Sequence, residues 1–189
     1  MSQFTREQVI EKYNRGETLS HLDLSGIDLS YENLKGADFS HCNLSDAHLQ
    51  NANLEATNFS DANLTNVFLF GANLSGACFD RADLSEGNLQ DTNLEKSTFK
   101  NANLFHAKLF GAQALNVEFN HAKLINGRLK RANFVSANFT GADLSNSHLE
   151  RADLKNAILD HANLSGAFLN NAILDNASMV DTNLDNVTK

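Results

Sequence analysis

Residues 72–84 read ANLSGACFDRADL, and every fifth residue in this stretch, Leu74, Phe79 and Leu84, is large and apolar. An alanine precedes each of the three by two positions. A period of five fits neither regular structure, because a helix would rotate about 140° per unit and scatter these side chains, and a flat strand would point successive ones to opposite faces. Each unit must therefore contain a corner, after which the next apolar pair faces the same interior.

The same spacing extends in both directions over almost the whole chain. Of the 34 positions at five-residue intervals from Leu19 to Leu184, 25 are Leu, seven are Phe, one is Met179 and one is Ala114. A second series of 34 positions runs two residues before the first, and 20 of them are Ala. The pattern predicts an all-β repeat solenoid with a narrow core of Leu and Phe closed by Ala, which leaves no wide internal pocket.

A longer period of twenty residues gives the size of one coil. Six phenylalanines recur at this interval without a gap, at Phe39, Phe59, Phe79, Phe99, Phe119 and Phe139. Four units therefore make one coil, and the 34 units give about eight and a half coils. At the ~4.8 Å spacing of neighbouring strands, the rod would be roughly 40 Å long with a column of stacked rings inside.

The units at 37–40, 52–54, 72–76 and 142–145, which read ADFS, ANL, ANLSG and ADLS, resemble those of the pentapeptide repeat family over residues 17–189. The resemblance implies a right-handed quadrilateral β-helix. It implies no single function, because members of the family include bacterial proteins that protect DNA gyrase from quinolones or peptide toxins by imitating DNA, and others that are secreted effectors.

Residues 1–16 lie outside the repeat and carry the signals of a short helix at about 5–15. Thr5 followed by Gln8 forms a capping box, and Gly16 is a helix stop. A terminal helix of this kind hides the open edge of the first coil of a solenoid. The side chains expected to cover that coil are Val9, Ile10 and Tyr13.

The C-terminal end shows no such cap, since the sequence stays in repeat phase to Lys189. Met179, Leu184 and Val187 would then be partly uncovered, and we expect two copies to associate through them as a twofold homodimer. Family resemblance adds that gyrase-protecting members often dimerise through a C-terminal helix and carry projecting loops. Neither feature is present in this sequence.

Composition narrows the functional classes further. The 189 residues carry a net charge of -8, contain no Pro and no Trp, and include no apolar run long enough to cross a membrane. The two cysteines, Cys42 and Cys78, form no disulfide framework or metal-binding spacing, and the first residues lack a secretion signal. We therefore expect a cytoplasmic protein with reduced thiols.

Catalytic and metal-binding functions find little support in the sequence. The seven histidines are scattered, and no Ser or Cys nucleophile accompanies them with a carboxylate. His41, His121 and His161 share one outward column but stand four and two coils apart, roughly 19 and 10 Å, too far to bind one ion together. We expect no enzymatic activity, no cofactor and no metal.

Charge is distributed in bands along the rod. Residues 17–95 carry 13 acidic and two basic side chains, residues 96–131 one acidic and seven basic, and residues 132–189 seven acidic and three basic. One interpretation is that the charged bands only keep the surface solvated. The other is that they steer partners, a basic partner to the N-terminal half or an acidic partner to the central band. Direct nucleic acid binding is not expected, because the acidic bands on both sides would repel phosphate.

The central band also has outward phenylalanines that a solenoid does not need for packing. A face that combines aromatic and arginine side chains is typical of protein-binding surfaces, although single exposed phenylalanines are normal on any protein. Leu115 is expected to turn inward and fill the space beside Ala114. The predicted partner-binding residues are Phe68, Phe70, Phe105, Phe110, Lys108, Arg128, Lys130, Arg131 and Arg151, with Phe168 on the same face.

Two functions follow from these features. The first is a non-enzymatic protein-interaction scaffold, a rigid rod that binds a partner protein through its outer faces. The alternative is a DNA mimic that binds DNA gyrase and protects it from gyrase poisons. In the alternative the charge of DNA would be imitated by Asp23, Asp28, Asp38, Asp46 and Asp61.

Overall fold

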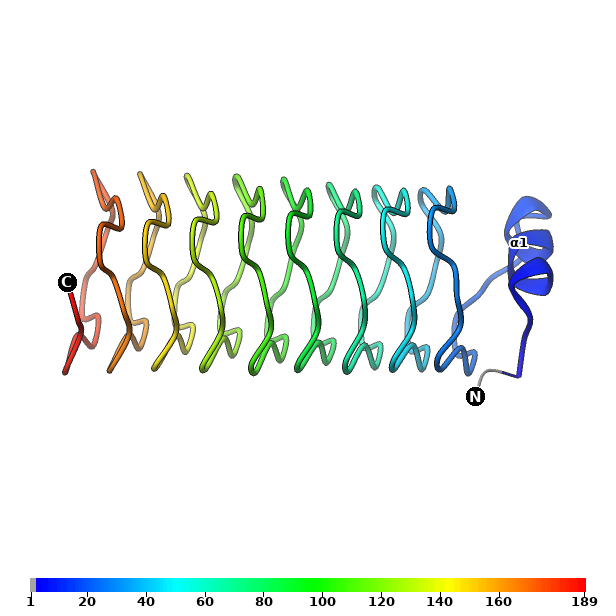
Figure 1. The fold of residues 1–189 in the computed structure, drawn as a ribbon, viewed down its shortest axis with the longest axis horizontal. Coiled ribbons are helices and arrows are strands. Elements are labelled where there is room, and N and C mark those ends of the chain that lie inside the picture. The colour runs from blue at the N-terminus through cyan, green and yellow to red at the C-terminus, as the bar shows by residue number, and fades with distance from the viewer. Residues whose placement is uncertain (1–2) are drawn as a thin grey trace.

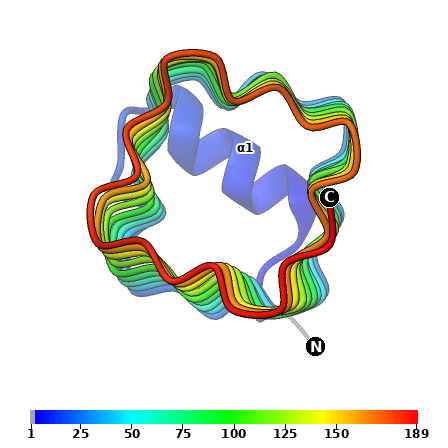
Figure 2. The same cartoon turned by 90° about the vertical axis from the view of Figure 1, so that its left-hand side faces the viewer.

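The computed structural model describes residues 3–189 and shows a straight rod of stacked coils with one short helix at its N-terminal end (Figure 1). Viewed along the axis, each coil is a four-sided ring, and successive rings superpose closely (Figure 2). The fold is the expected right-handed quadrilateral β-helix. Its four sides present four flat outer faces to solvent.

The coils are joined by parallel β-bridges between residues that are twenty positions apart. The bridges begin with Asp23 and Asn43 and continue to Phe168 and Thr188, and each is an isolated bridge rather than part of a longer strand. Leu24 N, for example, donates to Asn43 O over 2.7 Å, and Asn43 N donates to Leu22 O over 2.9 Å. The predicted coil of twenty residues is therefore confirmed.

Tight turns form the corners between units. Every fifth residue from Gly16 to Asn186 has a positive φ, and at most of these corners the next backbone N–H donates to the carbonyl three residues before it, as Ile27 N does to Leu24 O. This geometry places a left-handed residue at the third turn position, where Gly, Asn and Asp are favoured. Most of these corner residues are Asn, Asp, His or Gly, but longer side chains such as Arg81, Lys96, Arg131 and Arg151 also occupy them.

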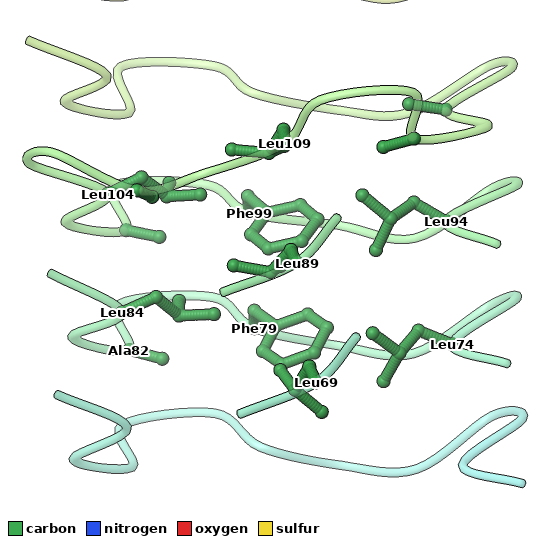
Figure 3. Close-up of a cluster of buried hydrophobic side chains, with 14 of the residues drawn as sticks. Leu69, Leu74, Phe79, Ala82, Leu84, Leu89, Leu94, Phe99, Leu104 and Leu109 are labelled. Atoms are coloured by element: carbon green, nitrogen blue, oxygen red, sulfur yellow. The ribbon is translucent and has the colours of Figure 1, made fainter. Parts of the chain in front are cut away.

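The interior is a dry column of Leu and Phe side chains (Figure 3). The phenylalanine column stacks in parallel, with centroid separations of 4.6 Å between Phe79 and Phe99 and 4.8 Å between Phe99 and Phe119. All three rings are fully buried. This spacing equals the distance between neighbouring coils, so the backbone register and the ring stack reinforce each other.

The expectation for Leu115 is wrong. Ala114 holds the inward position, while Leu115 is half-buried and lies outside the core cluster. The backbone explains the difference, because Ala114 N donates to Asn133 O over 2.8 Å and Lys96 N donates to Leu115 O over 2.9 Å. An inward Leu115 would break this ladder, which fixes alternate residues on opposite sides.

Helix α1, Arg6–Asn14, lies across the opening of the first coil (Figure 2). Its capping box is formed as predicted, with Thr5 N donating to Gln8 Oε1 over 2.8 Å and Gln8 N donating to Thr5 Oγ1 over 3.3 Å. Val9 is buried, and Phe4, Ile10 and Tyr13 pack against the core.

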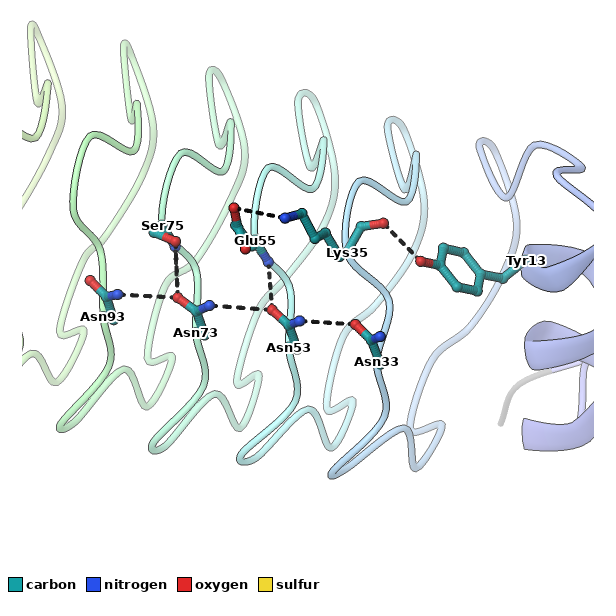
Figure 4. A network of polar contacts seen from close by, with 8 residues as sticks. All are labelled: Tyr13, Asn33, Lys35, Asn53, Glu55, Asn73, Ser75 and Asn93. Carbon is teal, nitrogen blue, oxygen red and sulfur yellow. Dashed lines mark hydrogen bonds and ion pairs between the residues drawn. The ribbon is translucent and has the colours of Figure 1, made fainter.

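Asparagine ladders run along the outside of the rod (Figure 4). Asn53 Nδ2 donates to Asn33 Oδ1 over 2.9 Å, and the chain of amide bonds continues through Asn73 to Asn93. The same side chains accept from a turn N–H, as Asn53 Oδ1 does from Glu55 N. These asparagines therefore stabilise the scaffold through both turn and ladder hydrogen bonds.

We expect Phe99→Ala to lower the free energy of unfolding by about 3–5 kcal/mol, because the ring lies between two others in a column that cannot collapse around the hole. Thermal denaturation followed by circular dichroism measures the effect. Lys123→Ala is the control, since Lys123 is exposed and has no ion pair within residues 3–189. Equal melting temperatures for the two variants would contradict the stacked core.

Candidate interaction surface

The register of twenty residues builds one outer face from distant parts of the chain. Phe68, Lys108, Arg128 and Phe168 lie in one column of successive β-bridges, in which Asn88 and His148 complete the series. A parallel column two residues further along the chain contains Phe70, Phe110 and Lys130. We call this surface the aromatic–basic face, defined as Phe68, Phe70, Lys108, Phe110, Arg128, Lys130, Arg131, Arg151 and Phe168.

Large apolar side chains on this face are open to solvent. Phe68 is 38%, Phe70 43% and Phe168 36% exposed. Two of them stack on histidines of the neighbouring coil, with centroid separations of 4.6 Å for His48 and Phe68 and 4.6 Å for His148 and Phe168. The stacks fix the orientation of these two rings, whose exposed atoms stay accessible to a partner.

Phe110 is half-buried rather than freely exposed, because Arg131 covers it. The Arg131 guanidinium carbon lies 5.8 Å from the centroid of the Phe110 ring, a cation–π distance. Phe110 also lines a surface hollow of about 420 Å³ together with Lys108, Arg128, Lys130 and Glu150. We call this depression the basic hollow.

Phe105 is set apart from the other predicted binding residues. It is 37% exposed, but its column belongs to the neighbouring face, and its ring packs edge-on against His106 at 4.1 Å. The corner between the two faces separates it from Phe110. The structure therefore brings together Phe68, Phe70, Phe110 and the five cations, and leaves Phe105 outside the group.

A second hollow of about 410 Å³ lies on the same side of the rod, nearer the N-terminus. Tyr31, His48, Gln50 and Phe70 line it, and Tyr31 is 75% exposed. Gln50 Oε1 is covered and has no hydrogen-bond partner within residues 3–189. The flat side that carries the aromatic–basic face is thus hollowed at two points, and Phe70 lies between them.

The aspartates of the acidic N-terminal coils mostly take part in turn hydrogen bonds. Asp38 Oδ1 accepts from Ser40 N over 3.1 Å, and Asp61 forms a paired contact with Arg81. Hydrogen bonding by Ser25 lowers the pKa of Asp23, and hydrogen bonding by Ser30 lowers the pKa of Asp28. Their negative charges are therefore held in fixed positions on the surface.

The histidines of the outward column do not form a binding site together. His21 stacks on His41 at 4.6 Å, one coil away, and His161 Nδ1 lies 3.6 Å from Asp181 Oδ2 in the same column. Within residues 3–189, no group of three or more His, Cys, Asp or Glu side chains is placed to hold a metal ion.

None of the helices in the described part of the chain is long and apolar enough to span a bilayer.

At the C-terminal coil, Leu184 is 39% exposed, whereas Met179 and Val187 are half-buried against the core. A homodimer through these three residues stays a prediction. So does the cytoplasmic location.

Some residues next to the aromatic–basic face were not predicted. They are His48, His148 and Glu150, which lie in the same columns as residues of that face. The signal that could have found them is their spacing of twenty residues from Phe68, Phe168 and Lys130, respectively. The covering of Phe110 by Arg131 had no such signal, because it depends on the side-chain conformation of a corner residue.

Comparison with known proteins agrees with this architecture. A family model of pentapeptide repeats matches the chain in eight copies, over residues 18–55, 37–76, 77–113, 116–151 and 152–188. No curated protein matches the chain significantly in sequence.

Several solved structures are similar. HetL, a pentapeptide repeat protein involved in the regulation of heterocyst differentiation in the cyanobacterium Nostoc sp. strain PCC 7120, is 26% identical with a TM-score of 0.52, covering 98% of this chain and 95% of HetL. A second pentapeptide repeat protein of Nostoc PCC 7120 is 35% identical over 52% of this chain and 80% of its own, with a TM-score of 0.49. QnrB1, a plasmid-mediated fluoroquinolone resistance protein, is 18% identical with a TM-score of 0.48, covering 85% and 78% of the two chains.

The two cysteines differ sharply in their surroundings. Cys42 is 1% exposed, its thiol donates to Leu19 O over 2.9 Å, and burial raises its pKa to about 11. Cys78 is half-buried in an outward column between Asn58 and Thr98.

We therefore expect iodoacetamide at about pH 8 to alkylate Cys78 in the folded protein and to spare Cys42, because only the thiolate reacts and the Cys42 thiol stays protonated and covered. Mass spectrometry of tryptic peptides measures both sites, and the denatured protein is the control in which both react. Equal labelling of the two cysteines in the folded protein would contradict the inward position of Cys42.

Proposed function

Since the chain belongs to the pentapeptide repeat family, we propose that it is a non-enzymatic scaffold, a rigid rod that binds a partner protein through the aromatic–basic face. The observation that carries the proposal is the position of Phe68, Phe70 and Phe168, exposed on the same side of the rod as five cations. Aromatic and arginine side chains are the residues most enriched at the energetic centres of protein interfaces.

The architecture suits binding better than catalysis. The interior is filled by side chains throughout, and the hollows on the aromatic–basic side are open depressions of the surface. Three coils separate Phe68 from Arg128, roughly 14 Å along the axis, which fits the centre of an interface of standard size. A flat and stiff face also loses little conformational entropy on binding.

Similarity to HetL supports a regulatory interaction. The two chains align over nearly their full lengths, and HetL is involved in the regulation of heterocyst differentiation. A role in regulation fits a protein that acts by contact with another protein. The partner of this chain would then be a protein recognised through outward side chains, since these are the positions that the repeat leaves free to vary.

A second candidate function is a DNA mimic that binds DNA gyrase. The acidic N-terminal coils favour it, because residues 17–95 carry 13 acidic and only two basic side chains. Hydrogen bonds fix Asp23, Asp28 and Asp38 in place on the surface, as an imitation of phosphate would require. The basic side chains of residues 96–131 interrupt the negative potential.

Replacement of Phe70 and Phe110 by Ser should weaken binding to the native partner by about a hundredfold if both are anchors, while folding is nearly unchanged, because neither side chain belongs to the core cluster. Affinity capture from native extract, followed by titration of the captured protein, measures the effect. Phe105→Ser is the control, since Phe105 is a phenylalanine with 37% of its surface exposed but lies on the neighbouring face. Unchanged capture by the double variant would refute the proposed surface.

The same variants separate the two functions. A DNA mimic would protect gyrase supercoiling from a quinolone, and this protection would survive the Phe70/Phe110 change. It would be lost in the triple variant Asp23→Asn, Asp28→Asn, Asp38→Asn, which removes charge and keeps the acceptor oxygen of each turn. No effect of the wild-type protein on gyrase at micromolar concentration would eliminate the mimic.

A further inference from the structure

The cations of the chain fall into two groups that differ in pairing. Of the 15 Lys and Arg residues, the seven up to Lys100 all form ion pairs, as Arg81 does with Asp61 and Lys100 with Glu118. The eight that follow have no acidic partner within residues 3–189. They are Lys108, Lys123, Arg128, Lys130, Arg131, Arg151, Lys155 and Lys189.

Five of these unpaired cations belong to the aromatic–basic face, and three line the basic hollow. Lys108 and Arg128 are partners in a β-bridge, so two like charges lie on adjoining coils with no acid between them. Lys130 lies beside Arg128 at the next outward position. Close like charges repel each other, and an anionic ligand seated among them would relieve that repulsion.

Arg131 occupies a left-handed corner with φ of 59°, as Arg81 and Lys96 do, but these two form ion pairs and Arg131 forms none within residues 3–189. Asn or Gly occupies that region at lower cost than a long side chain. No acidic group within residues 3–189 pairs with Arg131, and its guanidinium lies over Phe110 at the rim of the basic hollow.

The hollow also contains an acidic group, and this group restricts the kind of anion. Glu150 Oε2 is covered and has no hydrogen-bond partner in the described chain, while Oε1 lies 3.5 Å from His148 Nδ1. A chain of phosphates brings no N–H donor to this carboxylate. A peptide supplies both carboxylates for the cations and backbone N–H groups for Glu150.

We propose that the basic hollow binds an acidic segment of a partner protein in extended conformation. The carboxylates of the segment lie on Lys108, Arg128 and Lys130, and Phe70 provides an apolar contact next to them. Four coils separate Phe70 from Glu150, roughly 19 Å, which an extended chain covers with about six residues. This inference rests on the proposed function and adds the chemistry of the partner.

The test uses a fluorescein-labelled peptide of alternating Glu and Ser, a second peptide of alternating Gln and Ser, and a labelled oligothymidine of similar length. Fluorescence anisotropy with the full chain at low salt should show binding of the Glu peptide, with affinity that falls as salt rises. The Gln peptide should not bind, and the oligothymidine should bind more weakly than the Glu peptide.

Two matched double variants locate the site. Arg128→Glu with Lys130→Glu should weaken binding of the Glu peptide by about tenfold or more, because it reverses two charges in the hollow. Lys123→Glu with Lys155→Glu makes the same change in charge with unpaired cations of the two neighbouring faces and should change affinity less than about twofold. Arg131→Asn should weaken binding while the melting temperature stays equal or rises, which separates binding from folding.

Equal losses in the two double variants, tighter binding of oligothymidine than of the Glu peptide, or no binding of the Glu peptide would each overturn the inference. Failure of this inference can be distinguished from failure of the proposed function. If the Phe70/Phe110 change abolishes partner capture but the Glu peptide does not bind, the scaffold stands and its partner is not acidic. If the Glu peptide binds in the hollow but the Phe70/Phe110 change leaves partner capture intact, the proposed function fails.

Discussion

The stacked coils of this protein depend on one constraint, which is that the backbone hydrogen bonds of each coil are completed by the next coil. Each bridge joins residues twenty positions apart, from Asp23 with Asn43 to Phe168 with Thr188. Buried backbone groups must be paired, so a coil with one residue more or fewer would leave donors and acceptors without partners. The length of the coil is thereby fixed, and with it the stacking of inward side chains such as Phe79 and Phe99.

The same constraint places different requirements on the residues inside and outside the rod. Inward positions hold mostly Leu, Phe or Ala, with small residues such as Cys42 at some of them, whereas an outward residue has to be compatible only with its neighbours one coil away. Phe70, Phe110 and Arg131 are far apart in sequence and lie on one side only because the coil closes after twenty residues. Function in such a rod is therefore a property of columns of outward side chains, which the core supports and does not determine.

Sequence periodicity predicted the fold well because the five-residue and twenty-residue repeats are direct consequences of the corners and the coil. The capping box of Thr5 and Gln8 is equally local, and it was predicted for the same reason. Side-chain placement was harder to predict. Leu115 stays outside because both neighbouring backbone groups are held in the ladder, and Phe110 is half-buried because Arg131 bends over it. Both outcomes depend on contacts between coils that periodicity alone does not encode.

The register of twenty residues can be tested directly with a native thiol. Cys78 is the bridge partner of Thr98, so Thr98→Cys places two thiols on adjoining coils at a separation that a disulfide can span. Under mild oxidation we predict a crosslink between Cys78 and the thiol introduced at position 98, detected by mass spectrometry. Asn103→Cys, one unit further along and around a corner, should form none. Crosslinking at position 103 and not at 98 would contradict the coil of twenty residues and the aromatic–basic face built upon it.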